Sequence, residues 1–337
     1  GMQIGNQNTD DKVLLIAEIG NNHEGSFDLA CEMIRLAAHA GADAVKFQAI
    51  IPDRLVAAGE SVRIEQLDRF RLTPEQFGNL RDEAEKNGIL FMSTPFDPAA
   101  VDWLDDLVPA YKIASGDNDF YPLIDRVAQT GKPIIVSMGL GSAGNGRELL
   151  EFLRNSWERH GVPEPGIGLL HCVVSYPTPM REAGLSALGQ LKFPGVTVGY
   201  SDHTIGIRAA EMAVAAGARI IEKHFTIDKD HSDFRDHQLS ADPDELMALV
   251  KSIHEVETLL GDPTKLMKAC EAGNEMLVRR SIAAARDIAV DETITLGDLC
   301  WVRPRAELKP GEEDSICGRK LTKAIAHGEA FTLAHFK

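Results

Sequence analysis

The sequence alternates short apolar, β-branched runs with helix-like stretches from its start to about residue 260. Several of the helix-like stretches end at a glycine, a residue that suits the left-handed C-cap of a helix. Apolar strands that alternate with helices predict a parallel sheet covered by helices. Eight repeats within about 250 residues favour a closed (β/α)8 barrel over an open sheet. The eight strand-like runs cover residues 13–17, 44–47, 89–92, 110–114, 133–137, 168–171, 196–199 and 219–222.

The alternation stops after residue 260, and the tail has a different pattern. Residues 286–296 align with residues 323–333 as a degenerate internal repeat. Such a duplication predicts a small β-rich module with pseudo-two-fold symmetry. A module this short is expected to depend on the barrel or on a partner subunit for stability. We therefore expect an α/β barrel domain at 12–260, a linker at 261–280 and a β-rich domain at 281–337.

The composition excludes several classes of partner. The 337 residues carry a net charge of −16, with a pI near 5.1, whereas nucleic acids and anionic membranes require a basic surface. The five cysteines are scattered and form no CxxC pair, which is typical of reduced thiols. Beyond Gly1, which resembles an expression scar, we find no signal peptide and no apolar run of membrane-spanning length. We expect a cytoplasmic protein.

Two histidines end consecutive predicted strands, His203 after Tyr200-Ser201-Asp202 and His224 after Glu222-Lys223. In a barrel the carboxyl ends of all strands meet on one face, so the two rings can approach each other. Each histidine alone could be a hydrogen-bonded core residue. Together they suit a catalytic divalent metal with open coordination positions.

Two lysines, Lys46 and Lys112, also lie at predicted strand ends. Their side chains could extend to solvent at the barrel rim. If they point inward, they form with Ser115, Ser137 and Ser201 a cradle for phosphate and carboxylate oxygens, which is the interpretation we favour.

Glu18 ends the first predicted strand. It could form a salt bridge with a rim lysine, or it could act as a general acid and base with a pKa tuned by neighbouring charges. The sequence leaves both roles open.

Eight longer segments of the barrel region form a recognisable set: IAEIGNNHEG (16–25), VKFQ (45–48), STPFD (93–97), YKIASGD (111–117), GKPIIVSMG (131–139), LLHCVVSYPTP (169–179), GYSDHT (199–204) and IEKHFT (221–226). Together these segments resemble the sialic acid synthases. The tail, with RRSIAAARDI and WVRP, is similar to that family's C-terminal antifreeze-like (SAF) domain. The resemblance implies a TIM barrel followed by an antifreeze-like domain. It also implies metal-assisted condensation of phosphoenolpyruvate with an N-acetylmannosamine-type sugar, giving a nine-carbon 2-keto sugar acid and phosphate.

The resemblance also implies roles and partners. The cofactor would be a divalent metal, Mn2+ in the first place, with Mg2+ or Co2+ as second choices. The substrates would be phosphoenolpyruvate and an N-acylated amino sugar, and the assembly a domain-swapped homodimer. By motif position the metal ligands would be His203 and His224; the phosphoenolpyruvate ligands Lys46, Lys112, Ser115, Ser137 and Ser201; the catalytic residues Glu18 and Glu222; and the sugar-facing residues Gln48, Asp117, Tyr176, Asp236 and Arg303.

The sequence departs from the family pattern mainly on the sugar side. Val173-Val174 replaces a frequent threonine–asparagine pair, Asp117 replaces a longer glutamate, and the stretches 230–240 and 304–308 are altered. The acceptor sugar thus stays open, and a legionaminic- or pseudaminic-type acid synthase is compatible with the same residues. The sequence is also compatible with a related phosphoenolpyruvate-condensing keto-acid synthase and with a sugar- or ice-binding protein without catalysis.

Overall fold

The computed structural model describes residues 1–336. The chain divides into two compact units, Gly1–Gly261 and Asp262–Lys337. None of the helices among the described residues combines the length and the apolar character needed to cross a membrane.

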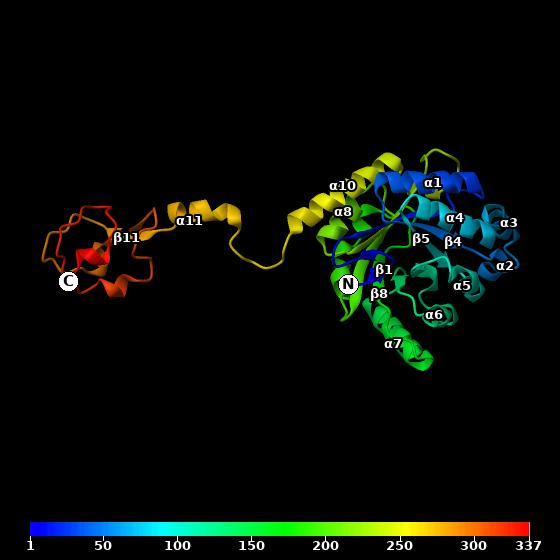
Figure 1. Ribbon diagram of the computed structural model, residues 1–337, viewed down its shortest axis with the longest axis horizontal. Coiled ribbons are helices and arrows are strands. Elements are labelled where there is room, and N and C mark those ends of the chain that lie inside the picture. The colour runs from blue at the N-terminus through cyan, green and yellow to red at the C-terminus, as the bar shows by residue number, and fades with distance from the viewer. Residues whose placement is uncertain (337) are drawn as a thin grey trace. The chain divides into compact units, whose positions relative to one another are not determined.

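The first unit is built around a closed barrel of parallel strands, as predicted (Figure 1). Strand β10 closes it by pairing with β3, which brings His224 beside Glu18. Each predicted strand is present, with bounds shifted by a few residues. The barrel strands are β3 (Leu14–Gly20), β4 (Ala44–Ala49), β5 (Leu90–Pro95), β6 (Tyr111–Ile113), β7 (Ile134–Ser137), β8 (Ile167–Cys172), β9 (Val196–Asp202) and β10 (Ile220–His224).

Helices surround the barrel, and their ends are set by local sequence. Ser26 caps the first long helix, α1, and Gly41 ends it at φ 95°, a conformation that favours glycine. After β8 the chain forms a 3-10 segment, η3, at the place where a regular barrel has an α-helix. The elements of this unit beyond the barrel strands are α1 (Phe27–Ala40), α2 (Pro52–Leu55), α3 (Ser61–Phe70), α4 (Pro74–Lys86), α5 (Pro98–Leu104), η1 (Ser115–Asp117), α6 (Tyr121–Ala128), α7 (Ala143–His160), η2 (Met180–Glu182), η3 (Leu185–Leu191), α8 (Arg208–Ala215), α9 (Asp236–Leu239) and α10 (Pro243–Leu260).

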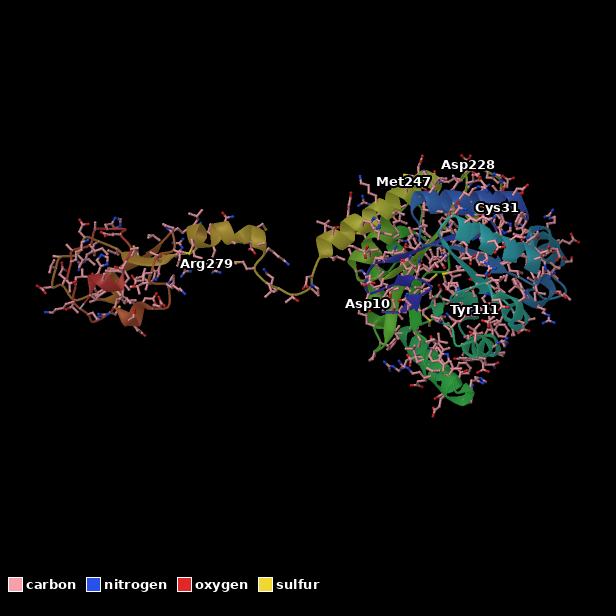
Figure 2. The ribbon with its side chains drawn as sticks, in the orientation of Figure 1. Asp10, Cys31, Tyr111, Asp228, Met247 and Arg279 are labelled. Atoms are coloured by element: carbon pink, nitrogen blue, oxygen red, sulfur yellow. The ribbon has the colours of Figure 1, made fainter. Side chains whose placement is uncertain are left out.

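Apolar side chains fill the barrel at the amino ends of its strands. A short hairpin, β1 (Gln3–Ile4) with β2 (Gln7–Asn8), contributes Met2 and Ile4 to this cluster, together with Leu14, Met92 and Leu170. A second, larger cluster lies between strands and helices and includes the fully buried Tyr111 (Figure 2). Because apolar packing closes the amino end, the polar strand ends at the carboxyl face are left to form a site.

The second unit contains little regular structure but shows the predicted internal repeat. Ile288 and Ile325, equivalent in the two halves, exchange main-chain hydrogen bonds of 2.9 and 3.0 Å. This antiparallel exchange between equivalent positions confirms the pseudo-two-fold relation. A short helix, α11, occupies part of the stretch that was predicted as a linker. The elements are η4 (Ala269–Glu271), α11 (Ala272–Val278), β11 (Ser281–Ala284), η5 (Leu296–Asp298), β12 (Leu299–Val302), η6 (Glu313–Ser315) and η7 (Leu333–His335).

Candidate active site

The carboxyl ends of the barrel strands surround a cavity of about 510 Å³. The predicted site residue Arg303 follows β12 and belongs to the second unit. The lining includes every predicted site residue of the barrel unit: Glu18, Lys46, Gln48, Lys112, Ser115, Asp117, Ser137, Tyr176, Ser201, His203, Glu222, His224 and Asp236.

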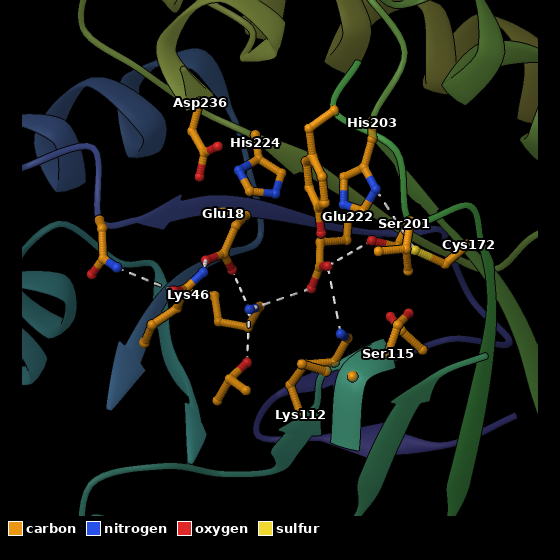
Figure 3. A pocket seen from close by; sticks show the side chains of 18 of the residues that line it. Glu18, Lys46, Lys112, Ser115, Cys172, Ser201, His203, Glu222, His224 and Asp236 are labelled. Atoms are coloured by element: carbon orange, nitrogen blue, oxygen red, sulfur yellow. Dashed lines mark hydrogen bonds and ion pairs between the residues drawn. The ribbon is translucent and has the colours of Figure 1, made fainter. Parts of the chain in front are cut away.

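Two lysines and two glutamates form a buried charge cluster at the floor of this cavity (Figure 3). Lys46 forms an ion pair with Glu18, and its Nζ lies 3.6 Å from an oxygen of Glu222. Lys112 Nζ lies 3.6 Å from the other Glu222 oxygen. The lysines are only 3% and 2% exposed, so they point inward and do not extend to solvent at the rim. Lys46 also donates a hydrogen bond of 2.8 Å to Thr94.

The two glutamates have opposite pKa shifts. Burial raises the pKa of Glu18, and the nearby Glu222 carboxylate raises it further, against the opposing effect of Lys46. Burial would also raise the pKa of Glu222, but Lys112, Lys46 and the Ser201 hydroxyl hold it well below its usual range. Carboxyl groups whose environments separate their pKa values in this way suit different roles. Glu18 is the better proton carrier, and Glu222 stays anionic.

The predicted serines lie around the lysines. Ser201 donates a hydrogen bond of 2.8 Å to Glu222, and Ser115 accepts one of 3.1 Å from the main chain of Gly139. The buried hydroxyl of Ser137 has no hydrogen-bond partner among the described residues. A buried polar group without a partner is unusual and often marks a ligand site.

The rings of His203 and His224 lie edge to face in the cavity wall, with centroids 5.3 Å apart and planes inclined by 62°. His203 Nδ1 lies 2.8 Å from the carbonyl oxygen of Val173, which can only accept, so in the neutral ring Nδ1 carries the proton and Nε2 keeps a lone pair. Burial holds the pKa of His224 well below its usual range, and its buried Nδ1 has no hydrogen-bond partner among residues 1–336. Residues 1–336 contain no group of three or more histidine, cysteine, aspartate or glutamate side chains that is arranged to hold a metal. Two imidazoles with available nitrogens nevertheless fit a divalent metal that keeps open positions.

A fully buried ion pair lies directly beside these histidines in sequence. Lys223 Nζ is 3.0 Å from Asp202 Oδ2, and neither side chain is exposed. Lys223 also donates a hydrogen bond of 2.6 Å to the carbonyl of Thr204. Since successive strand residues point to opposite faces, this pair lies on the face opposite to the histidines and joins β9 to β10.

The predicted sugar-facing residues of the barrel unit line the same cavity, next to these groups. Gln48 donates a hydrogen bond of 3.3 Å to Glu18, and the Tyr176 ring lies 4.3 Å from that of His203. Burial raises the pKa of Asp117 to about 6. The lining residues that sequence reasoning did not assign come from loops, from the short helices α2, α3 and η1 and from strand ends: Asn21, Leu55, Arg63, Thr94, Phe96, Ala114, Gly116, Cys172, Val174, Phe234 and Arg235.

Comparisons with known proteins agree with this arrangement. The model of the NeuB family matches residues 33–265. The chain is 36% identical to an N,N'-diacetyllegionaminic acid synthase of Campylobacter jejuni, over 94% of this chain and 98% of the relative. It is 34% identical to a pseudaminic acid synthase of the same species, over the full length of both. The crystal structure of an N-acetylneuraminic acid synthetase from Leptospira borgpetersenii matches with 33% identity and a TM-score of 0.75, over 81% of this chain and 94% of the other. The chain therefore belongs to the NeuB family and is an enzyme of the sialic, legionaminic and pseudaminic acid synthase type.

Proposed function

We propose that this protein condenses phosphoenolpyruvate with an N-acylated amino sugar of the N-acetylmannosamine type, giving a nine-carbon 2-keto sugar acid and phosphate. The observation that carries the proposal is the buried cluster of Lys46, Lys112 and Glu222. Together with the unpartnered Ser137 hydroxyl, this cluster lines a cavity of about 510 Å³. Two ammonium groups and several hydroxyls provide donors for the phosphate and carboxylate of such a substrate. The names of the relatives support a sugar acceptor.

The proposed chemistry assigns a step to each carboxyl group. The methylene carbon of phosphoenolpyruvate attacks the aldehyde carbon of the open-chain sugar, water adds at C2, and phosphate leaves by cleavage of the C2–O bond. Glu18, with its raised pKa, would carry protons to and from the oxygens around C2. Glu222 would stay anionic, holding Lys46 and Lys112 charged and in place.

His203 and His224 would hold the divalent metal, with Mn2+ as our first expectation and Mg2+ or Co2+ as second choices. A metal bound there would act as a Lewis acid that withdraws charge from the aldehyde oxygen. Gln48, Asp117, Tyr176 and Asp236 would contact the sugar. We further propose that residues 281–337 are an antifreeze-like domain, that Arg303 reaches the sugar site of a partner subunit in a domain-swapped homodimer, and that the enzyme works in the cytoplasm.

A phosphate-release assay tests the proposal. The protein is incubated with phosphoenolpyruvate, Mn2+ and a panel of N-acetylmannosamine, legionaminic-type and pseudaminic-type sugar precursors. Release is expected only with a six-carbon acetamido sugar, and the best acceptor identifies the product. Release with a phosphorylated tetrose or pentose would instead indicate a keto-acid synthase of shorter products. No release with any sugar would refute the proposed function. The His203→Asn variant should lose Mn2+ binding measured by calorimetry.

A further inference from the structure

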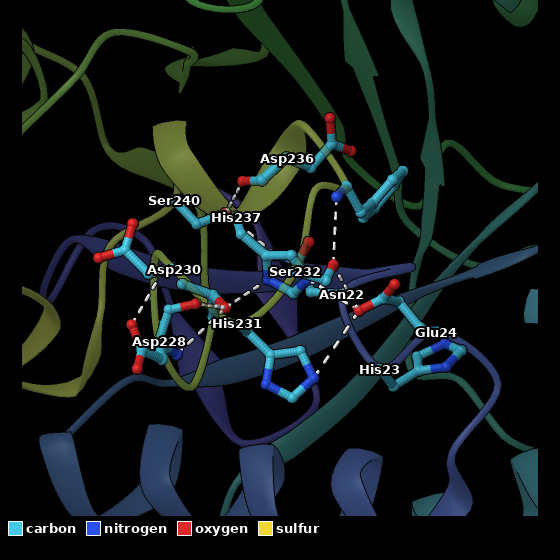
Figure 4. A network of polar contacts seen from close by, with 12 residues as sticks. Asn22, His23, Glu24, Asp228, Asp230, His231, Ser232, Asp236, His237 and Ser240 are labelled. Atoms are coloured by element: carbon cyan, nitrogen blue, oxygen red, sulfur yellow. Dashed lines mark hydrogen bonds and ion pairs between the residues drawn. The ribbon is translucent and has the colours of Figure 1, made fainter.

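The carboxylate of Glu24 lies outside the cavity and contacts side chains of a loop that forms part of the cavity wall (Figure 4). Glu24 follows β3, and its Oε2 accepts a hydrogen bond of 2.9 Å from the Ser232 hydroxyl. The same oxygen lies 3.1 Å from Nε2 of His237 and 3.7 Å from Nε2 of His231. His237 is fully buried, and its other ring nitrogen lies 2.7 Å from the Thr226 hydroxyl. One carboxylate thus contacts three side chains of the loop 226–240.

The main chain around Glu24 is held in an uncommon shape. Glu24 has φ 48°, a conformation that non-glycine residues rarely adopt and that persists only where the surroundings impose it. Gly25 follows at φ 84°, and a Cβ added there would lie 2.2 Å from the carbonyl oxygen of Arg69. The close approach of this neighbouring backbone limits how the segment can move, so the direction of the Glu24 side chain is set by its main chain.

A second set of contacts joins the same two segments. Asn22 is buried and donates hydrogen bonds of 2.8 Å to the Phe225 carbonyl and 3.0 Å to the Ser240 hydroxyl. The Ser240 hydroxyl in turn donates to the main-chain oxygen of Asp236. The chain of contacts that begins beside Glu24 therefore ends at Asp236, a residue of the cavity wall.

The side of the loop 226–240 that lines the cavity differs from the side that makes these contacts. Arg235 and Asp236 line the cavity, whereas Glu24, His237 and Asn22 do not. The Arg235 guanidinium lies 4.8 Å from the centre of the Tyr176 ring. The loop thus has a buried side that is bound to the segment after β3 and a second side that faces the sugar half of the cavity.

We propose that Glu24, with His237 as its main partner, is a positioning residue that orders the loop 226–240 before the acceptor sugar binds and thereby sets acceptor affinity. The part of this inference that concerns the acceptor rests on the proposed function. Ordering a loop during binding lowers affinity, so contacts that order it in advance raise affinity. No contact of Glu24 reaches Lys46 or Lys112, so binding of the donor substrate should not depend on it.

Hydrogen–deuterium exchange on the full chain without substrates tests the positioning role directly. In Glu24→Ala, peptides from 226–240 are expected to exchange about tenfold faster or more, since hydrogen bonds to a charged acceptor are lost. Glu24→Gln retains one carbonyl acceptor and should show an intermediate increase. Glu32→Gln, which alters a solvent-exposed ion pair with Arg35 on α1, is the matched control and should exchange as the wild type does. Unchanged exchange at 226–240 in Glu24→Ala would overturn the inference.

Kinetics with the best acceptor of the panel test the consequence. We expect Glu24→Ala to raise the acceptor KM about tenfold and to leave the KM for phosphoenolpyruvate within about twofold of wild type. Ser232→Ala removes the hydrogen bond from the Ser232 hydroxyl to Glu24 and the one that this hydroxyl accepts from the main chain of Phe234, but keeps the contact of Glu24 with His237. It should shift both measurements in the same direction by a smaller amount, even if Glu24→Ala does not fold. An equal rise of both KM values would overturn the inference. Failure of the wild type with every sugar would refute the proposed function, while the exchange measurement would still decide the positioning role.

Discussion

The buried ion pair between Asp202 and Lys223 gives a quantitative prediction about stability. Both side chains are fully buried, with Nζ and Oδ2 3.0 Å apart. Unit charges at this distance attract by about 5 kcal/mol at an effective dielectric constant of about 20. Lys223→Met removes the ammonium and leaves the Asp202 carboxylate buried without a counter-charge. Loss of one partner from such a pair costs about 3–5 kcal/mol, and we expect the free energy of unfolding to fall by that amount.

A double-mutant cycle separates the pair from other effects. Asp202→Asn keeps an oxygen for the hydrogen bonds from Tyr200 and from the main chain and hydroxyl of Thr204, while removing the charge. Asp202→Asn combined with Lys223→Met leaves neither charge buried, so the double variant should be more stable than Lys223→Met alone. Urea unfolding followed by far-UV circular dichroism gives the four free energies, with an expected coupling of about 3 kcal/mol.

A coupling below about 1 kcal/mol would refute this reasoning, because it would show that each charge is compensated without the other. The cycle also bears on the histidines. Since Asp202 and Lys223 precede His203 and His224 directly, Lys223→Met should weaken Mn2+ binding measured by calorimetry if the pair holds β9 and β10 in register.

Three further predictions concern single residues. Glu18→Gln should slow phosphate release about 10²–10⁴-fold and leave phosphoenolpyruvate binding nearly unchanged, whereas lost binding would contradict a proton-transfer role. Burial lowers the pKa of His23 to about 4, and its Nδ1 accepts a hydrogen bond from Gly25. As the pH falls, the imidazole of His23 is therefore protonated in the unfolded chain before it is protonated in the folded protein. The contribution of the neutral ring to the free energy of unfolding is present in full above about pH 6.5, and about 3 kcal/mol of it should be lost as the pH drops to 4. This loss should be absent in His23→Gln, and an equal slope in both proteins would contradict it. Gly25→Ala should lower the free energy of unfolding by about 2 kcal/mol or more because of its φ and the contact with Arg69, whereas Gly78→Ala, with open space around it, should not.

Much of the barrel could be predicted because its signal is local. An apolar run such as 13–17 followed by a helix-like stretch is visible within a short window, and the closed parallel barrel confirmed the prediction. The polar residues at the strand ends were equally visible in the sequence. Because the barrel brings all strand ends to one face, the predicted residues of the barrel unit line one cavity. The direction of a side chain was harder to predict. Lys46 could have pointed to solvent or inward, and the register of β4 between β3 and β5 decides that it meets Glu18 and Glu222.

The pattern of residues thus determined the fold class, the repeat in the tail and the face on which polar groups collect, because these depend on periodicities along the chain. Contacts between distant loops depended on the closed barrel. Glu24 and His237 are 213 positions apart, and no local pattern connects them. They meet because the pairing of β10 with β3 places the segment after one strand against the loop after the other. Hydrogen bonding across that closure is a property of tertiary structure, and it decides which side of the loop 226–240 faces the cavity.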